Sequence, residues 1–281
     1  MPIYNQTYSS WDGQLMANPK PWWLIAKTGI GKVFQKWMII LLVFSSFQFV
    51  FRLFQIVAMS YVGEKNPFQN MNIDLDINNH FFNSFLSGQG FFLLLVILFA
   101  GADLISRDRS LNALPLYFSR PVGFHDYVLG KWLIVAFFSA LVTLVPALIL
   151  FTVQLAFSQN SIFLQSYYWI PLALLGDWIL QTLVMGGLIL ALSALVKGAR
   201  SVLVFIFLIY FPEMIRVIFS RIPELGLFSI KAGLKQAEAF FFQEELPYEF
   251  SVWIALLLFL ILAAISYAIL RWRVKPVEIV K

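Results

Sequence analysis

Long apolar segments alternate with short polar or charged stretches along the whole chain. A membrane-spanning helix needs about 20 mostly apolar residues to cross a hydrocarbon core of roughly 30 Å. Six segments meet this requirement, and we predict an all-α integral membrane protein with spans over residues 37–62, 81–105, 128–151, 169–196, 201–219 and 251–270. The fifth span is the weakest, because Pro212 and Glu213 directly follow its apolar run and a helix that ended there would leave five spans.

A shorter segment, residues 21–37, has apolar residues at helical spacing. It predicts a helix that lies in the inner membrane interface, with its lysines near anionic head groups. A simple N-terminal extension of the first span is the alternative. The residues assigned to this interfacial helix are Trp22, Trp23, Lys27, Ile30, Val33 and Trp37.

Residues 227–241, just before the sixth span, repeat this amphipathic pattern. An apolar stripe with a polar face opposite to it predicts an outer-surface or re-entrant helix that caps the spans. The stripe consists of Leu227, Ile230, Leu234, Ala237 and Phe241, and we place Lys231, Lys235 and Glu238 opposite to it.

Composition and charge add a direction to this layout. The chain is 60% hydrophobic and 12% charged, whereas soluble domains carry about 25% charged residues, so an ordinary soluble enzyme is excluded. The net charge of +5 raises the question of nucleic-acid binding, but 14 of the 20 Lys and Arg residues lie on one side of the predicted spans. Basic loops mark the cytoplasmic side of a membrane. We therefore predict cytoplasmic N- and C-termini in the cell (inner) membrane and no nucleic-acid partner.

The same layout gives one membrane domain. Residues 1–36 form a cytoplasmic N-terminus with the interfacial helix, residues 37–270 form the six-span domain, and residues 271–281 form a cytoplasmic tail. The first 36 residues lack the short apolar core and the small-residue cleavage site of a secretory signal peptide. We therefore expect the chain to begin in the cytoplasm.

Residues that could carry catalysis or bind a metal are scarce. The chain has no cysteine, and neither His80 nor His125 has a second ligand at the spacing of a metal pair, so we predict solvated loop histidines and no metal site. The string from Thr28 to Val33 ends like a phosphate-binding loop but lacks the first glycine and the hydroxyl after the lysine. We therefore predict no catalytic residue and no cofactor in this chain.

Ionisable residues within or beside spans are expensive and are functional candidates by default. The four candidates are Arg52, Asp103, Asp177 and Glu213. Arg52 and Asp177 lie at matching predicted depths, which suggests the hypothesis that they pair. The alternative is that each side chain reaches the membrane interface by its position or by snorkelling.

The most informative stretch is residues 101–122, between spans two and three. A charged cluster of Arg107, Asp108 and Arg109 directly follows the span, and a short apolar run then ends at Ser-Arg-Pro. This pattern predicts a cytoplasmic helical turn that presents bulky apolar residues to another protein; an interfacial anchor is the alternative. The four apolar residues are Leu111, Leu114, Leu116 and Tyr117.

This stretch resembles the first cytoplasmic loop of ABC-2 type transporter permeases, the six-span membrane subunits of ABC exporters. In that family a span ends in an Ile-Ser-x-Glu-Arg-Glu-like cluster, followed by a Gly-Thr-Leu-like segment, a Leu-rich turn, an Arg-Pro-Val-like step and a Gly-Lys-like pair. The matching positions are Ile105, Ser106, residues 107–109, Leu111, Leu114, Leu116, Ser119, Arg120, Pro121, Val122, Tyr127, Leu129, Gly130 and Lys131. The order Arg-Asp-Arg departs from the family pattern, and Ser110-Leu111 replaces Gly-Thr.

The resemblance implies the permease subunit of an ATP-driven exporter for an apolar or amphipathic substrate, such as a lipid, a drug or antibiotic, or a peptide. Its partners would be two cytoplasmic ABC ATPase subunits that bind ATP and Mg²⁺, a second permease of the same or related sequence, the lipid bilayer, and accessory periplasmic or membrane proteins. The short helix after span two would dock on the ATPase as a coupling helix. The coupling residues would be Arg107, Asp108, Arg109, Leu111, Leu114, Leu116, Tyr117 and Arg120.

Two other function classes stay open. The charged residues Arg52, Asp103 and Asp177 motivate an intramembrane enzyme that modifies lipids. A non-transporting membrane assembly or anchor protein is the third class.

Overall fold

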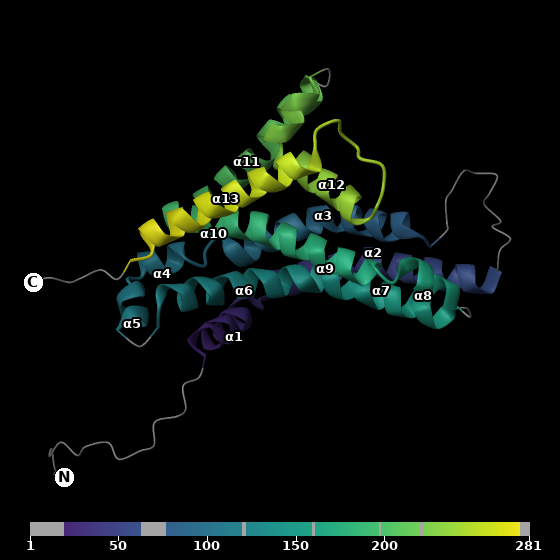
Figure 1. The fold of residues 1–281 in the computed structure, drawn as a ribbon. Helices are drawn as coiled ribbons and strands as arrows, with labels where there is room; N and C mark the ends of the chain where they lie inside the picture. Colours follow the sequence, from purple (N-terminus) through teal and green to yellow (C-terminus); the bar gives the residue numbers. More distant parts are fainter. Residues whose placement is uncertain are drawn as a thin grey trace, which may run out of the picture.

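The computed structural model describes residues 20–62, 77–119, 122–158, 161–196, 198–219 and 222–275, and within these ranges every regular element is helical (Figure 1). Arg120 and the residues beyond Lys275 lie outside the described ranges. In chain order the elements are α1 (Pro21–Val33), α2 (Lys36–Val62), α3 (Asn79–Gly101), α4 (Ser106–Ser110), α5 (Leu114–Phe118), α6 (Phe124–Val142), α7 (Leu144–Phe157), α8 (Ser161–Tyr167), α9 (Ile170–Gln181), the π-helical turn η2 (Thr182–Gly186), α10 (Gly187–Leu195), α11 (Ala199–Ile218), the 3-10 turn η3 (Pro223–Phe228), α12 (Ile230–Phe241) and α13 (Val252–Arg273).

Six helical segments are long and apolar enough to cross a membrane, which confirms the predicted count within the described part of the chain. They are Lys36–Ser60, Asn79–Ser110, Phe124–Phe157, Phe163–Leu195, Arg200–Ile218 and Val252–Arg273. The fifth helix, α11, continues through Pro212 to Ile218. The chain therefore has the architecture of a multi-pass membrane protein.

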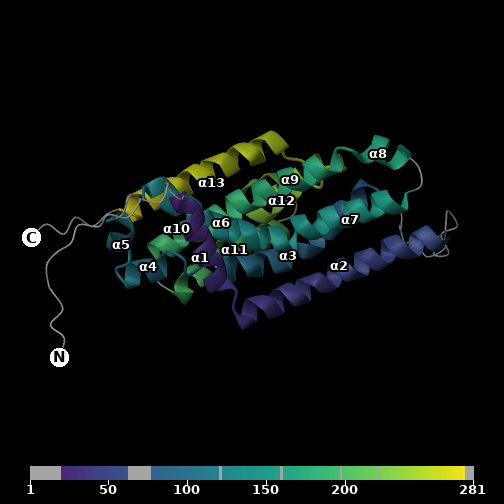
Figure 2. The same cartoon turned by 90° about the horizontal axis from the view of Figure 1, so that it is seen from below.

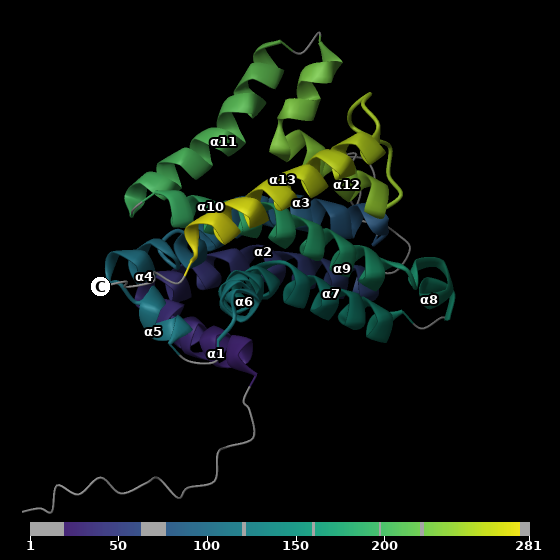
Figure 3. The same ribbon diagram turned by 60° about the vertical axis from the view of Figure 1, so that its left-hand side comes forward.

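The six segments divide into an inner group and an outer group. The share of the most apolar stretch that is buried within the chain is 61% for the α3 segment, 56% for α6–α7 and 61% for α8–α10, but 11% for α2, 17% for α11 and 22% for α13. We call α3, α6–α7 and α9–α10 the inner group. Figure 3 shows α11 diverging from the other long helices before the chain returns to α12. Lipid or a partner must therefore cover most of the surface of α2, α11 and α13.

The elements also define two ends of the bundle. α4, α5 and the C-terminal end of α13 lie together at one end, which we call the α4 end (Figure 1). α8 and the beginning of α3 lie at the other, which we call the α8 end.

The N-terminal helix α1 lies crosswise against α6 near the α4 end (Figure 2). Two glycines permit the close contact, because a Cβ at Gly130 would lie 2.8 Å from the Ile25 Cβ and one at Gly29 would lie 2.1 Å from the Ile134 Cδ1. The buried face of α1 is Ile25 and Ala26. α1 is therefore separate from the first span, and the chain leaves helical geometry at Phe34 and Gln35 before α2 begins.

The structure places the predicted interfacial residues in different surroundings. Ile30 and Val33 pack against an apolar cluster that includes Met38 and Ile134, whereas Trp23 is 55% exposed. Trp22 is half-buried and Lys27 is exposed. Trp37 belongs to α2 and is exposed, because the break after α1 takes it off the α1 stripe.

Helix α12 occupies the predicted position before the last span and packs against α9, α11 and α13. Leu234 and Ala237 are buried as the stripe predicts. The placement of Glu238 on the polar face is wrong, because its side chain is buried. Leu234, Glu238 and Phe241 follow the helical spacing i, i+4, i+7, so Glu238 belongs to the buried stripe.

Candidate functional site

The short helix α4 is fastened to the end of α10. The backbone N–H groups of Ile105 and Ser106 both donate to Ser193 Oγ over 3.1 Å. Arg109 Nη1 also donates to the backbone carbonyl oxygen of Ala194. These bonds hold the turn between α3 and α4 against the last turn of α10.

A nearly buried ion pair fastens α4 to α6 as well. Lys131 Nζ lies 2.7 Å from Asp108 Oδ2, and Tyr127 OH donates to the same oxygen over 2.8 Å. The Lys131 and Asp108 side chains are 7% and 17% exposed, so water weakens their attraction less than it would at the surface. α4 is thus tied to two helices of the inner group.

The following helix, α5, rests on the same tyrosine. The rings of Tyr117 and Tyr127 meet edge to face with centroids 5.2 Å apart. Burial, and after it the nearby Asp108 carboxylate, raises the pKa of Tyr117, so its hydroxyl stays neutral at physiological pH. α5 therefore packs on the same tyrosine that binds Asp108 of α4.

The structure divides the four apolar residues of this loop into two pairs. Leu111 and Leu116 are 68% and 71% exposed, although the chain has ample apolar surface to pack against. Leu114 is buried in the main core cluster, and Tyr117 is half-buried against that cluster. Leu111 and Leu116 are therefore free to contact another molecule, whereas Leu114 and Tyr117 hold α5 to the bundle.

A cavity of about 730 Å³ opens between α1 and the α4–α5 loop. Its wall includes the charged residues Lys32, Asp103, Arg107, Asp108 and Lys131. Its rim also includes the exposed Leu111, so apolar and charged groups face the same space. A mixed surface of this kind is typical of protein interfaces, in which a polar rim surrounds apolar contacts.

The predicted pairing of Arg52 with Asp177 is wrong. Arg52 Nη1 donates to Gln55 Oε1 over 2.9 Å and Nη2 donates to Ser84 Oγ over 2.8 Å, so the guanidinium binds neutral groups on α2 and α3. Asp177 accepts from Gln181 Nε2 over 2.7 Å on its own helix. A glutamine one turn away on its own helix binds each side chain, and neither has a charged partner among the described residues.

The other two candidates are also separate from one another. Asp103 is exposed beside the cavity at the α4 end. Glu213 accepts two bonds from Arg216, one turn further along α11, and one from Ser229 Oγ, which joins α11 to the beginning of α12. The stretch from Ser84, where Arg52 binds, to Asp103 corresponds to roughly 28 Å along a helix. The four charges therefore do not form one site.

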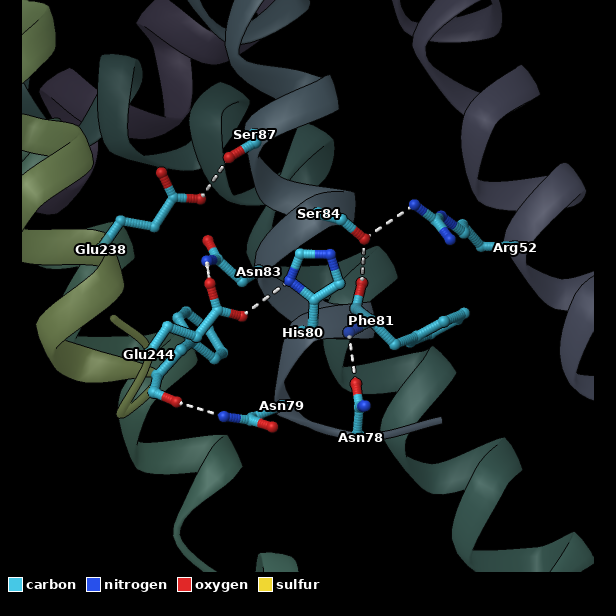
Figure 4. Close-up of polar contacts among 11 residues, drawn as sticks. Arg52, Asn78, Asn79, His80, Phe81, Asn83, Ser84, Ser87, Glu238 and Glu244 are labelled. Carbon is cyan, nitrogen blue, oxygen red and sulfur yellow. Dashed lines mark hydrogen bonds and ion pairs between the residues drawn. The ribbon is translucent and has the colours of Figure 1, made fainter. Parts of the chain in front are cut away.

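Polar residues gather near the beginning of α3, and of these the sequence patterns did not single out Asn83, Ser87 and Glu244 (Figure 4). Asn83 Nδ2 donates to a Glu244 carboxylate oxygen, and His80 Nδ1 lies 3.1 Å from the other. Ser87 Oγ donates to Glu238 Oε1 over 3.1 Å. His80 lies in the first turn of α3 rather than in the predicted loop.

An apolar groove of about 480 Å³ runs between α6, η2, α10 and α13. Leu183, Leu190 and Leu270 line it, while His125 and Asp126 lie on its border. The groove therefore combines a long apolar wall with a short polar section.

Compared with models of known protein families and with curated proteins, the chain matches none.

Proposed function

We propose that the chain is the permease subunit of an ATP-driven exporter and that its α4 end faces the cytoplasm. The observation that carries this proposal is the anchoring of the loop that resembles the ABC-2 coupling loop. α4 is bonded to α10 through Ser193 and to α6 through Asp108 and Lys131. A helix tied to two long helices can transmit a push from a cytoplasmic motor as a rigid-body movement.

Exposed apolar residues on the same loop support a docking role. Leu111 and Leu116 point away from the core that holds Leu114. An exposed leucine that becomes buried in an interface contributes about 1.5–3 kcal/mol. Lys32 and Arg107 line the same cavity as Leu111, which suits an ATPase surface of mixed polarity.

The exposed spans support pairing with a second permease. α2 and α11 bury only 11% and 17% of their most apolar stretches within the chain. Lipid can cover such faces, but a second copy or a related permease would cover them with matching side chains. The proposed assembly therefore contains two permeases and two ATPase subunits, and ATP and Mg²⁺ are bound by the ATPases.

The groove between α6 and α13 supports an apolar or amphipathic substrate. Aliphatic side chains and the rings of Trp132 and Tyr267 form most of its wall, and its polar residues include Ser266, His125 and Asp126. A lipid-like molecule could lay its chain along the leucines and keep its polar end at that border. The intramembrane-enzyme alternative finds less support, since Arg52, Asp103 and Asp177 each have different surroundings.

The test is co-purification of the tagged chain from its native membranes, followed by identification of any ATPase bound to it. We expect an ATPase with a complete phosphate-binding loop in the parent, and at least about a tenfold lower yield of it with Leu111→Ala plus Leu116→Ala, because a loss of 1.4 kcal/mol is a factor of ten. A matched control is Leu257→Ala plus Leu260→Ala, which removes two leucines of similar exposure (58% and 65%) from α13. A parent chain that purifies without an ATPase, or equal yields from the two double variants, would refute the proposal.

A further inference from the structure

Two buried carboxyl groups lie where α12 packs against α3 and α9. Glu238 of α12 is 6% exposed and Asp177 of α9 is 2% exposed. Ser87 of α3 donates to Glu238, and Gln181 donates to Asp177. Three helices thus bring two acidic side chains into a region from which water is largely excluded, although neither an export step nor docking at the α4 end requires them there.

The cluster contains more hydrogen-bond acceptors than donors. An ionised carboxylate only accepts, whereas a protonated carboxyl also donates. Among the described residues, Asp177 Oδ1 is buried without any hydrogen-bond partner, and so is Oδ1 of Asn83 on α3, whose amide nitrogen binds Glu244. Neither Asp177 nor Glu238 forms an ion pair within that part of the chain. These buried acceptor oxygens lack hydrogen-bond donors. A ligand that supplies a donor and occupies almost no volume would therefore satisfy them.

The raised pKa of Glu238 also indicates that this cluster needs a hydrogen-bond donor. Burial, and after it the charge of Asp177, raises the pKa of Glu238 from an ordinary 4.5 to about 8. Glu244 acts in the same direction, while the bond from Ser87 and the charge of Lys235 oppose it. At neutral pH Glu238 therefore favours the protonated form.

The charged residues of the neighbouring elements do not change the preference of Glu238 for the protonated form. α13 carries no charged residue between Val252 and Leu270, and the Glu213–Arg216 pair of α11 is satisfied within itself and by Ser229. Lys231 of α12 lies over the ring of Tyr210 of α11, and Glu224 of η3 is exposed. The titratable groups that face the cluster are Asp177 from α9, His80 from α3, and Lys235 and Glu244 from α12 and the loop after it.

Figure 4 shows a series of polar residues between His80 and Glu238. His80, whose side chain is 63% exposed, contacts Glu244, which is 18% exposed. Asn83, on the same face of α3, bonds Glu244, and Ser87 follows one turn deeper with Glu238. The exposed end of this series lies at the α8 end of the bundle.

We propose that Asp177 and Glu238 form a proton-binding site that is loaded from the α8 end by way of His80 and Glu244. A proton supplies the missing donor and removes one of two neighbouring negative charges. A hydrated metal ion fits less well, because both carboxyls are almost fully buried and the described residues contain no group of three His, Asp or Glu side chains able to hold one. The site does not depend on the proposed export function.

Infrared spectroscopy of the purified protein in lipid vesicles tests the site directly. Protonated carboxyl groups have a C=O stretching band that carboxylates lack. We expect this band at pH 7, with half of its intensity lost near pH 8, and a smaller band in both Glu238→Gln and Asp177→Asn. The control is Glu245→Gln, which changes an exposed neighbour of Glu244 and should leave the band unchanged. A parent spectrum at pH 7 equal to that of the Glu238→Gln, Asp177→Asn double variant would overturn the proposal.

The pH dependence of thermal stability provides a second measurement. The unfolded chain releases the Glu238 proton near pH 4.5 and the folded chain near pH 8. Between these values the folded state binds more protons, so stability falls as pH rises through this window and levels off above it. The melting temperature of Glu238→Gln should therefore decline less than that of the parent between pH 5 and pH 8, and Glu245→Gln should follow the parent. Parallel curves for the parent and Glu238→Gln would contradict the site, whatever the co-purification experiment shows.

Discussion

Replacing Gly130 by alanine should loosen the N-terminal helix α1 from the bundle. A Cβ at this position would lie 2.8 Å from the Ile25 Cβ and 2.9 Å from the Trp22 carbonyl oxygen. Non-bonded carbon atoms are most favourable at about 3.5–4.0 Å. Neither contacting atom can rotate away, because the backbone of α1 fixes both. The helix must therefore shift as a body.

The expected energy follows from that shift. Inserting one methyl group into a well-packed contact costs about 1–3 kcal/mol. α1 has only 13 residues, and isolated helices of this length are marginal in water. A weaker contact with α6 should therefore also expose the amide groups of α1, and the same energy range corresponds to about 5- to 150-fold in the undocking equilibrium.

Hydrogen–deuterium exchange of the α1 peptide, followed by mass spectrometry, measures this equilibrium. Gly130→Ala should accelerate exchange across residues 24–33 by about 5- to 150-fold, while the α13 peptide keeps the parent rate. Gly31→Ala is the matched control, because no atom lies within 4 Å of a Cβ there. Equal exchange in the parent and Gly130→Ala, or an equal acceleration in Gly31→Ala, would refute the packing argument.

Two further predictions concern the α4–α5 loop. Lys131→Met leaves Asp108 without its cation and should lower the unfolding free energy by about 3–5 kcal/mol. The melting temperature should fall, and adding Asp108→Asn to the same chain should partly restore it. An unchanged melting temperature of Lys131→Met would argue against the ion pair. Leu114→Ala should cost about 2–5 kcal/mol through the cavity it leaves, whereas Leu116→Ala, at a 71% exposed position, should leave the melting temperature unchanged. Equal melting temperatures for these two leucine variants would contradict the assigned burial.

The sequence predicted the spans well because a bilayer imposes a simple requirement of length and apolarity. All six predicted spans overlap the six apolar helical segments. The ends were less accurate, since the third segment continues to Phe157 and the fourth begins at Phe163. Hydropathy alone cannot locate these ends, because α7 and α8 contain polar residues such as Gln154 and Gln165 beside the apolar runs.

Side-chain partners could not be predicted from depth alone. Arg52 and Asp177 have opposite charges at similar depths, yet Ser84 and Gln181 lie closer to them and bind them. Leu114 and Leu116 are two positions apart, so they point to different sides of a helical turn, and only the packing of α5 reveals which side is buried. Pairing therefore depended on the rotation of each helix about its axis.

The burial of Glu238 could have been predicted from the sequence, because Glu238 lies at helical spacing between Leu234 and Phe241 of the apolar stripe. From the sequence we instead place Glu238 opposite the stripe, where charged residues usually lie. A carboxyl group that follows an apolar stripe at helical spacing is instead a candidate for burial with a proton. The same reasoning applies to Asp177, which lies within an apolar span and is buried.

The two polar sites lie toward opposite ends of the same inner helices. Two paths join the carboxyl cluster to α4. The first runs along α3, which carries Ser87 and leads into α4. The second runs along the α9–α10 segment, which carries Asp177 and then Ser193, the residue that binds the beginning of α4. α3 is continuous from Ser87 to Gly101, where the turn to α4 begins, whereas η2 interrupts the second path with π-helical geometry. Coupling between distant sites requires an element with two discrete arrangements, and single π turns occur frequently at functional sites. η2, held to α6 by Thr182 and Ser139 at 3.0 Å, lies on this second path between Asp177 and the Ser193 that binds α4.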